Sequence, residues 1–156
     1  MKNKTCCIFG HRKIDLSDKQ IKALTAQIEN LVTNEKVNTF VFGSKSQFND
    51  LCLNIVSKLK EKYPHIERIY IRAEYPFITK QYEEYLLCQY ESTYFPENII
   101  NAGKARYIER NYEMVKKSDI CLIYYDPNHL KPNSGTYKAY KYAEKKKRKI
   151  INTFYI

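Results

Sequence analysis

The stretch DICLIYY, residues 119–125, decides the fold class of this 156-residue chain. Six apolar or aromatic residues in a row follow the aspartate, and such runs are typical of strands that are buried on both faces of a parallel sheet. A second run of this kind, TCCIF at residues 5–9, lies near the start of the chain and ends at Gly10. We therefore expect two buried strands that are far apart in the sequence.

Helical patterns alternate with strand patterns along the rest of the chain. Ser17 and Gln20 have the spacing of a capping box, and apolar residues at helical spacing follow them up to Val32. The other expected elements are a strand at 38–42, a helix at 45–62, a strand at 66–72, a helix at 78–94, a loop or short strand at 95–103, a helix at 104–117, a helix at 136–147 and a strand at 149–155.

Strands that alternate with helices of crossover length predict a parallel sheet covered on both faces. The predicted fold is therefore α/β, a Rossmann-like three-layer sandwich with a mainly parallel sheet. The chain length favours one domain over residues 1–156.

Cysteine usage and hydropathy predict a reduced, cytoplasmic protein. The five cysteines form no CxxC pair, and no histidine stands at zinc-site spacing from any of them, so we expect no metal site and no cofactor. Four of them, Cys6, Cys7, Cys52 and Cys121, fall on expected buried faces and are interpreted as small core residues. The longest apolar runs are far shorter than a membrane span, so no membrane contact is expected.

The net charge of +10 favours an anionic partner. Nucleic acid, anionic lipid and a phosphorylated small molecule are three possible partners of this kind, and the charge alone does not choose among them. The densest basic run, KKKRK at 145–149, ends a predicted helix. Cations there complement the carbonyl end of the helix dipole, so a solvated helix end is the first interpretation and a nucleic-acid patch is the alternative.

Candidate ligand contacts gather where the expected strands end. In open parallel sheets, ligands bind beyond the carboxyl ends of the strands, where glycines allow close approach and helix N-termini present free amides. Ser and Thr hydroxyls and an arginine fork suit phosphate oxygens. The candidates at this edge are Gly10, His11 and Arg12, then Gly43 and Ser44, then Arg72 and Glu74, and finally Tyr125 and Asp126 with Ser134, Gly135 and Thr136.

Several of these residues have more than one interpretation. His11 is a ligand donor, an acid or base, or a residue that only organises its loop. Tyr125 either stacks on a base or closes the core. Arg110 and Asn111 lie on the helix before residues 119–125, where an exposed polar pair is the simplest interpretation.

Four motifs in order carry a family resemblance: CCIFGHR, FVFGSKSQF, YIERNYEMVKKSDICLIYYD and SGTYKAYKYAEKKKRKIIN. Together they resemble the YpsA-like branch of the SLOG superfamily, over about residues 4–152. That superfamily also includes the DNA-processing protein DprA and the LOG-type (Lonely Guy) cytokinin-activating enzymes. The resemblance implies a Rossmann-like fold that binds a nucleotide or an ADP-ribose-like ligand, and it also suggests a homo-oligomer. The implied contacts are Gly10, His11, Arg12, Gly43, Ser44, Arg110, Asn111, Ser134, Gly135 and Thr136.

Departures from the enzymatic relatives bear on activity. Their PGGxGTxxE-type signature corresponds here to PNSGTYKA at 132–139, and Ala139 stands where their glutamate is expected. The loop GSKSQFND also replaces a more glycine-rich loop. The leading hypothesis is therefore a binding protein that acts as sensor, regulator or sequestering protein. The alternatives are a nucleotide phosphoribohydrolase or N-glycosidase that uses Glu74 or Asp126, and a nucleic-acid-binding protein related to DprA.

Overall fold

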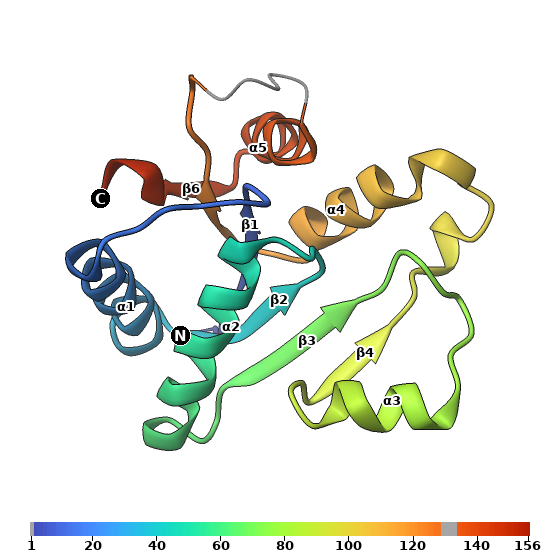
Figure 1. Cartoon of the computed structure of the whole chain (residues 1–156), viewed down its shortest axis with the longest axis horizontal. Coiled ribbons are helices and arrows are strands. Elements are labelled where there is room, and N and C mark those ends of the chain that lie inside the picture. The colour runs from blue at the N-terminus through green and yellow to red at the C-terminus, as the bar shows by residue number, and fades with distance from the viewer. Residues whose placement is uncertain (1, 129–133) are drawn as a thin grey trace.

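The computed structural model describes residues 2–128 and 134–156 of the chain, and these residues form one sheet of six parallel strands with helices on both sides (Figure 1). The strand order is β4-β3-β2-β1-β5-β6, and each of the five neighbouring pairs is parallel. The strands are β1 (Lys4–Gly10), β2 (Val37–Phe42), β3 (Glu67–Ile71), β4 (Ser92–Tyr94), β5 (Ile120–Tyr124) and β6 (Lys149–Asn152). The helices are α1 (Asp18–Thr33), α2 (Gln47–Lys62), α3 (Lys80–Leu87), α4 (Arg106–Lys116) and α5 (Gly135–Lys145). The predicted α/β fold with a parallel sheet is confirmed.

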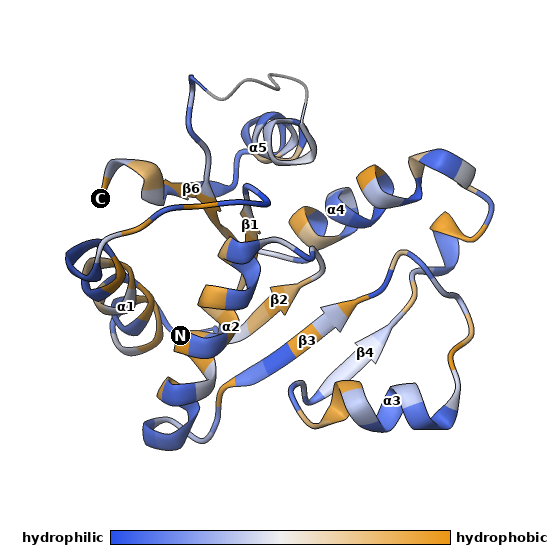
Figure 2. Cartoon of the chain, in the orientation of Figure 1, coloured by the Kyte–Doolittle hydropathy of each residue, from blue (hydrophilic) through white to orange (hydrophobic). Residues whose placement is uncertain are grey.

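Successive residues of β1 face opposite sides of the sheet, as in any strand. Cys6 and Ile8 belong to an apolar cluster that includes the inner faces of α1 and α2. Cys7 and Phe9 belong to a second cluster, which includes the inner faces of α4 and α5. All four side chains are buried, and Figure 2 shows in orange how hydrophobic the neighbouring strand β2 is. The sheet is therefore the middle layer of a three-layer sandwich.

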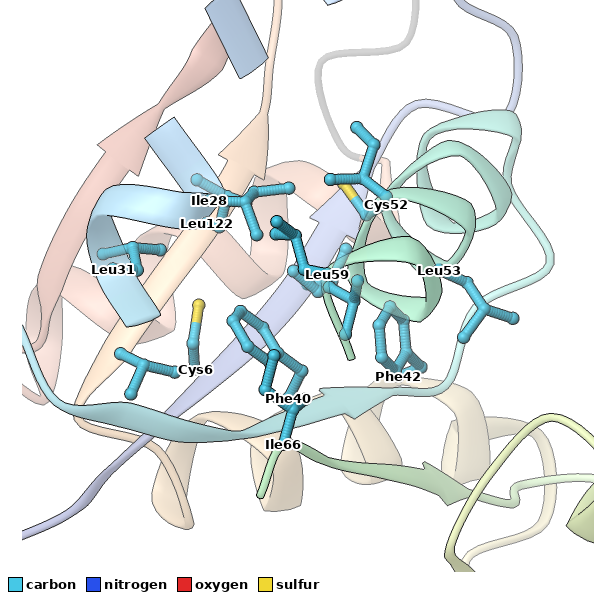
Figure 3. Packing of buried hydrophobic residues seen from close by; sticks show 14 of the residues in the cluster. Cys6, Ile28, Leu31, Phe40, Phe42, Cys52, Leu53, Leu59, Ile66 and Leu122 are labelled. Carbon is cyan, nitrogen blue, oxygen red and sulfur yellow. The ribbon is translucent and has the colours of Figure 1, made fainter. Parts of the chain in front are cut away.

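The larger cluster fills the space between the sheet and the helices α1 and α2 (Figure 3). Leu31 of α1 and Leu59 of α2 pack in it with Phe40 of β2 and Leu122 of β5. Burial of a side chain of this size contributes about 1.5–3 kcal/mol, so this layer dominates the favourable side of folding. Cys52 lies in the same cluster and is a core residue, as expected.

Serine caps fix the starts of three helices. Ser17 and Gln20 form the predicted capping box of α1, with hydrogen bonds of 3.2 and 2.8 Å. Ser46 caps α2 by accepting a 3.0 Å hydrogen bond from the Asn49 N–H, so this helix starts two residues later than predicted. Ser134 caps α5. A cap of this kind stabilises a helix by about 1 kcal/mol.

The predicted helix at 78–94 is wrong in its second half. α3 ends at Leu87, and β4 pairs with β3 at the edge of the sheet. Glu91 explains the change, because its N–H donates to the Arg68 carbonyl over 2.8 Å. Its carboxylate in turn accepts hydrogen bonds from the backbone and guanidinium of Arg68. These contacts turn the chain away from the helix and lay it beside β3.

Two other segments differ from expectation. The stretch at 95–103, expected as a loop or short strand, contains a 3-10 helix at Glu97–Ile99, and a second begins at Gly103. The last strand stops at Asn152 because the Asn152 side chain accepts a 3.2 Å hydrogen bond from the Phe154 N–H and starts a 3-10 helix. Pro132 and Asn133 of the stretch PNSGTYKA lie outside the described residues.

Cys6, Cys7, Cys52 and Cys121 are buried free thiols, and Cys88 is exposed. Within residues 2–128 and 134–156, no group of three or more His, Cys, Asp or Glu side chains is placed to hold a metal ion. Across the same residues, every helix is too short or too polar to cross a membrane.

Candidate functional site

The carboxyl ends of β1 and β5 meet at the point where the chain changes sides of the sheet. β1 lies between β2 and β5, and the helix after β1 covers one face whereas the helix after β5 covers the other. Gly10 is the register partner of Tyr124, the last residue of β5. Ligands of open parallel sheets bind beyond such a point. We call this carboxyl-end edge of the sheet the rim.

His11 joins the two strand ends across the rim. Its side chain is only 4% exposed, and its Nε2 accepts a 2.9 Å hydrogen bond from the backbone N–H of Asp126. A ring nitrogen that accepts a hydrogen bond carries no proton, so Nε2 is unprotonated in this arrangement. The imidazole also lies 5.9 and 5.6 Å from the rings of Tyr124 and Tyr125. His11 therefore organises the rim, and Nε2 is not available as a base toward a ligand in this arrangement.

Gly10 is required by helix packing. A Cβ atom on Gly10 would lie 2.4 Å from the side chain of Phe48, which is fully buried in the first turn of α2. The Gly10 backbone is not in the left-handed region. The glycine thus lets α2 approach the end of β1, a role different from the ligand approach that the sequence suggested.

The loop after β1 is fastened to the start of α2. The Gln47 N–H donates to the Arg12 carbonyl over 2.9 Å, and the Gln47 Oε1 accepts a 2.9 Å hydrogen bond from the Ile14 N–H. The first amide of α2 is therefore occupied by the protein itself. The Arg12 side chain is exposed, and no ion pair involves it within the described residues. Sequence reasoning missed Gln47, since nothing in its local pattern shows this contact.

Ser44 lies beside the cap of α2. Its Oγ is 3.1 Å from the Oγ of Ser46, which itself accepts the Asn49 N–H. The hydroxyl of Ser44 is half-buried and already has a partner. At this loop a phosphate would therefore meet the Ser44 hydroxyl beside the start of α2, where the Gln47 and Asn49 amides already have partners within the protein.

Arg110 is a buried arginine that passes over Gly43. Its side chain is 6% exposed, and a Cβ on Gly43 would lie 2.9 Å from its Cδ. The guanidinium donates from Nε to Asn111 Oδ1 over 2.9 Å and from Nη1 to the Ile71 carbonyl over 3.2 Å. Burial lowers the pKa of Arg110 from its usual value. The interpretation of Arg110 as an exposed surface residue is therefore wrong.

The charge of Arg110 has no counter-ion among the described residues, because no carboxylate there lies within 4.0 Å of its guanidinium. A buried charge is costly unless it is paired. Among the described residues, Arg110 is thus a buried cation at the rim with no direct carboxylate partner, and the charge of Glu74 acts on it only from beyond ion-pair distance.

The start of α5 lies next to this cation. A Cβ on Gly135 would lie 3.7 Å from Asn111 Nδ2, so the side chain that binds Arg110 also borders α5. Gly135 is exposed and Thr136 is buried. The Tyr137 N–H of α5 is taken by the Ser134 Oγ over 3.2 Å, and the other amides of its first turn have no partner within the helix and favour anions. Arg110, Asn111 and the start of α5 are therefore brought together.

Arg72 and Glu74 are held by other contacts. The Arg72 guanidinium donates to Thr93 Oγ1 over 3.1 Å and to the Tyr75 carbonyl over 3.2 Å, which fixes the connection after β3. Glu74 forms an ion pair of 2.9 Å with Lys45. Both residues follow the end of β3, and both side chains already form hydrogen bonds or an ion pair within the protein.

Tyr125 and Asp126 are positioned by Asn152, a residue that sequence reasoning missed. Asn152 Oδ1 accepts the Tyr125 N–H over 3.0 Å, and its Nδ2 donates to the Tyr125 carbonyl over 2.9 Å. The Tyr125 ring lies 5.8 Å from the ring of Tyr137 in the first turn of α5. The Asp126 carboxylate accepts a 2.8 Å hydrogen bond from the Asn128 N–H. The available signal was an asparagine in the middle of the strand predicted at 149–155, where this residue type is unfavourable.

Ala139 is fully buried in the apolar cluster beneath α4 and α5. It shares that cluster with Phe9 and Ile123. A carboxylate at this position would enter an apolar layer, where ionisation is unfavourable. The position therefore serves packing in this chain.

Two surface hollows, of about 410 and 340 Å³, lie away from the rim. Their linings share Thr33 and Tyr63, at the carboxyl ends of α1 and α2, and they include none of the candidate residues. Helix carbonyl ends repel anions. We therefore place the candidate site at the rim and not at these two hollows.

The family model YpsA, described as the YspA SLOG family, matches residues 2–155. The chain belongs to the YpsA family of SLOG proteins. No curated protein matches the sequence.

In this YpsA family member, the motifs of the resemblance form two connected groups at the rim. One group is Gly10, His11, Tyr125 and Asp126, and the other is Gly43, Arg110, Asn111 and Gly135. The contact between the rings of Tyr125 and Tyr137 links the first group to α5. Arg72 and Glu74 stand at the adjoining strand end with contacts of their own.

Proposed function

We propose that this chain binds an anionic, nucleotide-derived ligand at the rim and holds it without cleaving it, as a sensor, regulator or sequestering protein. The observation that carries the proposal is Arg110, a buried guanidinium with no carboxylate partner among the described residues. A phosphate between Arg110 and the start of α5 would supply the missing charge.

The physical reason lies in the cost of an isolated buried charge. Removing an ion from water costs several kcal/mol, and an opposite charge with good hydrogen bonds offsets this cost. An arginine fork and the free amides of a helix start both suit phosphate oxygens. Family membership supports a nucleotide-derived ligand over simple phosphate, because the resemblance to SLOG proteins implies that ligand class.

The carboxylates near the rim favour binding over cleavage. Cleavage of an N-glycosidic bond requires a carboxylate that stabilises the developing cation or activates water. Ala139 occupies the position of the relatives' glutamate and is buried in the core. Glu74 is paired with Lys45, and the Asp126 carboxylate closes its own turn with Asn128. Each candidate acid is therefore engaged elsewhere.

Contacts in the basic run reduce the support for nucleic-acid binding. Arg148 donates to the Val115 carbonyl over 3.3 Å and to the Lys116 carbonyl over 3.2 Å, so it caps the end of α4. Lys149 forms an ion pair with Glu35. Two of the five cations at 145–149 thus have structural roles.

A thermal-shift panel tests the proposal. The purified chain is mixed with nucleoside mono- and diphosphates, ADP-ribose and cyclic nucleotides, with the parent nucleosides as phosphate-free controls. A specific ligand at about 100 times its Kd stabilises the fold by about 2.7 kcal/mol. We expect a phosphorylated compound to raise the melting temperature and its nucleoside to leave it unchanged. Equal shifts with nucleosides, or no shift at all, contradict the proposal.

Two variants of one residue sharpen this test. Gly135→Ala should bind like the parent chain, because a Cβ there makes only an ordinary contact of 3.7 Å with Asn111. Gly135→Glu places a carboxylate at the start of α5, where it competes with the phosphate, and should abolish the shift. Release of a free base during incubation would instead favour the N-glycosidase.

A further inference from the structure

Exposed hydrophobic side chains are concentrated in one part of the molecule. Among the described residues, six of the eight large hydrophobic side chains that are exposed lie between positions 75 and 107. Phe77 is 86% exposed, Tyr85 is 60% exposed and Tyr75 is 54% exposed. Figure 2 shows hydrophobic segments in the connection before α3 and at the end of α3. Exposed apolar side chains that cluster in this way are typical of interaction sites.

The aromatic side chains form a connected row. The ring of Tyr75 meets that of Tyr82 edge-on at 6.4 Å, and Tyr82 stacks on Tyr85 at 6.2 Å. Leu87, which is 45% exposed, lies at the end of the same helix. We call this surface, with the carboxylates of α3, the acidic aromatic face. Its residues are Tyr75, Phe77, Glu83, Glu84, Tyr85 and Leu87, which lie on the connection before α3 and around the exposed sides of that helix.

The charge of this segment is opposite to that of the chain. Residues 73–100 carry five glutamates and one lysine, although the chain as a whole has a net charge of +10. Glu74 and Glu91 are paired with Lys45 and Arg68. Within the described part of the chain, Glu83 and Glu84 are exposed and form no ion pair. The face therefore suits a basic partner and repels nucleic acid.

A matching basic surface lies on α5. Lys138, Lys141 and Lys145 are three and four residues apart, so they share one side of the helix. Lys141 and Lys145 are exposed; Lys141 forms an ion pair of 3.2 Å with Glu144 of the same helix, and Lys145 forms none among the described residues. α3 packs against β4 and α5 packs against β5 and β6, which places the two surfaces at opposite edges of the sheet (Figure 1).

We infer that the acidic aromatic face binds the lysine side of α5 from a second copy of this chain. Because the two surfaces differ and lie at opposite edges, the contact is head-to-tail and adds copies in a ring or an open row. Charge complementarity selects this occupant over an isologous pairing, in which the unpaired glutamates of two such faces would meet. The inference does not depend on the ligand proposed for the rim.

Sedimentation velocity on the full chain at two ionic strengths tests the association. At about 0.01 M salt the Debye length is about 30 Å and the faces attract, whereas at about 1 M it is about 3 Å. We expect assemblies larger than a monomer at low salt and a shift toward monomer at high salt. A chain that stays monomeric at low salt and high protein concentration overturns the inference.

Charge reversal identifies the two faces. A head variant carries Glu83→Lys with Glu84→Lys, and a tail variant carries Lys141→Glu with Lys145→Glu. Each variant alone should be monomeric, because its two faces then have the same charge. An equimolar mixture of the two variants should associate again, since the basic faces of the head variant can bind the acidic faces of the tail variant. Assembly that survives the tail changes, or a mixture that remains monomeric, overturns the inference.

A third variant tests the apolar part of the contact. Phe77→Ser removes the most exposed ring and should weaken assembly at every salt concentration. Far-UV circular dichroism checks that each variant is folded. All of these positions are exposed, so loss of assembly in a folded variant is read as loss of the contact.

Discussion

The imidazole Nε2 of His11 accepts a 2.9 Å hydrogen bond from the backbone N–H of Asp126 and so ties the end of β1 to the end of β5. These residues are 115 positions apart in the sequence. The bond holds the two loops that flank the switch point of the sheet. It also gives His11 a structural role that needs no proton transfer.

Replacement of His11 should cost stability. His11→Phe keeps a ring among Tyr124 and Tyr125 but leaves the Asp126 N–H without its acceptor, which costs about 1–3 kcal/mol. Urea denaturation measures the change in the free energy of unfolding. His65→Phe is the matched control, because His65 is exposed and surface changes stay within about 0.5 kcal/mol. Equal values for the two variants would show that the bond contributes nothing.

Alanine at two glycines of the rim should have opposite outcomes. Gly10→Ala drives a Cβ to 2.4 Å from Phe48, and overpacking of this kind costs about 1–3 kcal/mol. Gly135→Ala meets no such contact. It should be neutral or should stabilise the fold by about 0.4–1 kcal/mol, because alanine lowers the conformational entropy of the unfolded chain. Thermal unfolding of both variants compares them. A tolerated Gly10→Ala would refute the packing role.

The buried strands could be predicted because both of their faces are apolar. β4 could not, since Tyr82, Leu86 and Tyr90 repeat every four residues and continue the helical pattern past the end of α3. Leu86 and Tyr90 do reach the same core, but Tyr90 does so from the turn after α3. The contact of Glu91 with Arg68 decides the turn, and its two partners are 23 positions apart. Such a contact is invisible to local periodicity.

The sequence predicts where the candidate site lies better than it predicts the contacts that its residues make. Topology alone brings Gly10 and Asp126 to the rim, because parallel strands end at one edge. The packing role of Gly10 could not be predicted, because Phe48 approaches it only in the folded chain. Arg110 reads as a surface residue on a polar helix, and only packing over Gly43 buries it.

The contact between Glu91 and Arg68 should make stability depend on pH. Partial burial raises the pKa of Glu91, but the hydrogen bonds and charge of Arg68, with the charge of Lys60, outweigh it and hold the pKa below its usual value. A lowered pKa stabilises the fold above the unfolded value of about 4.3, and this contribution is lost as the pH falls through the folded value.

Glu91→Gln measures this contribution. The variant should be less stable than the parent chain by about 1 kcal/mol near neutral pH, and this difference should narrow as the pH falls below the unfolded value of about 4.3. Urea denaturation at several pH values gives both curves. Glu61→Gln, at an exposed position, should follow the parent chain throughout. A constant gap between Glu91→Gln and the parent would exclude a role for the charge.

The most direct test of an unpaired cation at the rim compares Arg110→Met with Arg148→Met, using unfolding with and without a phosphorylated ligand found in the panel. Arg110→Met should leave the stability of the free chain unchanged or higher, because an apolar side chain replaces an uncompensated charge, and should abolish stabilisation by the ligand. Arg148→Met removes the cap on α4, so it should lower stability and keep the ligand's effect. If Arg110→Met instead weakens the free chain and still responds to the ligand, Arg110 is a structural residue and the proposed anion site is wrong.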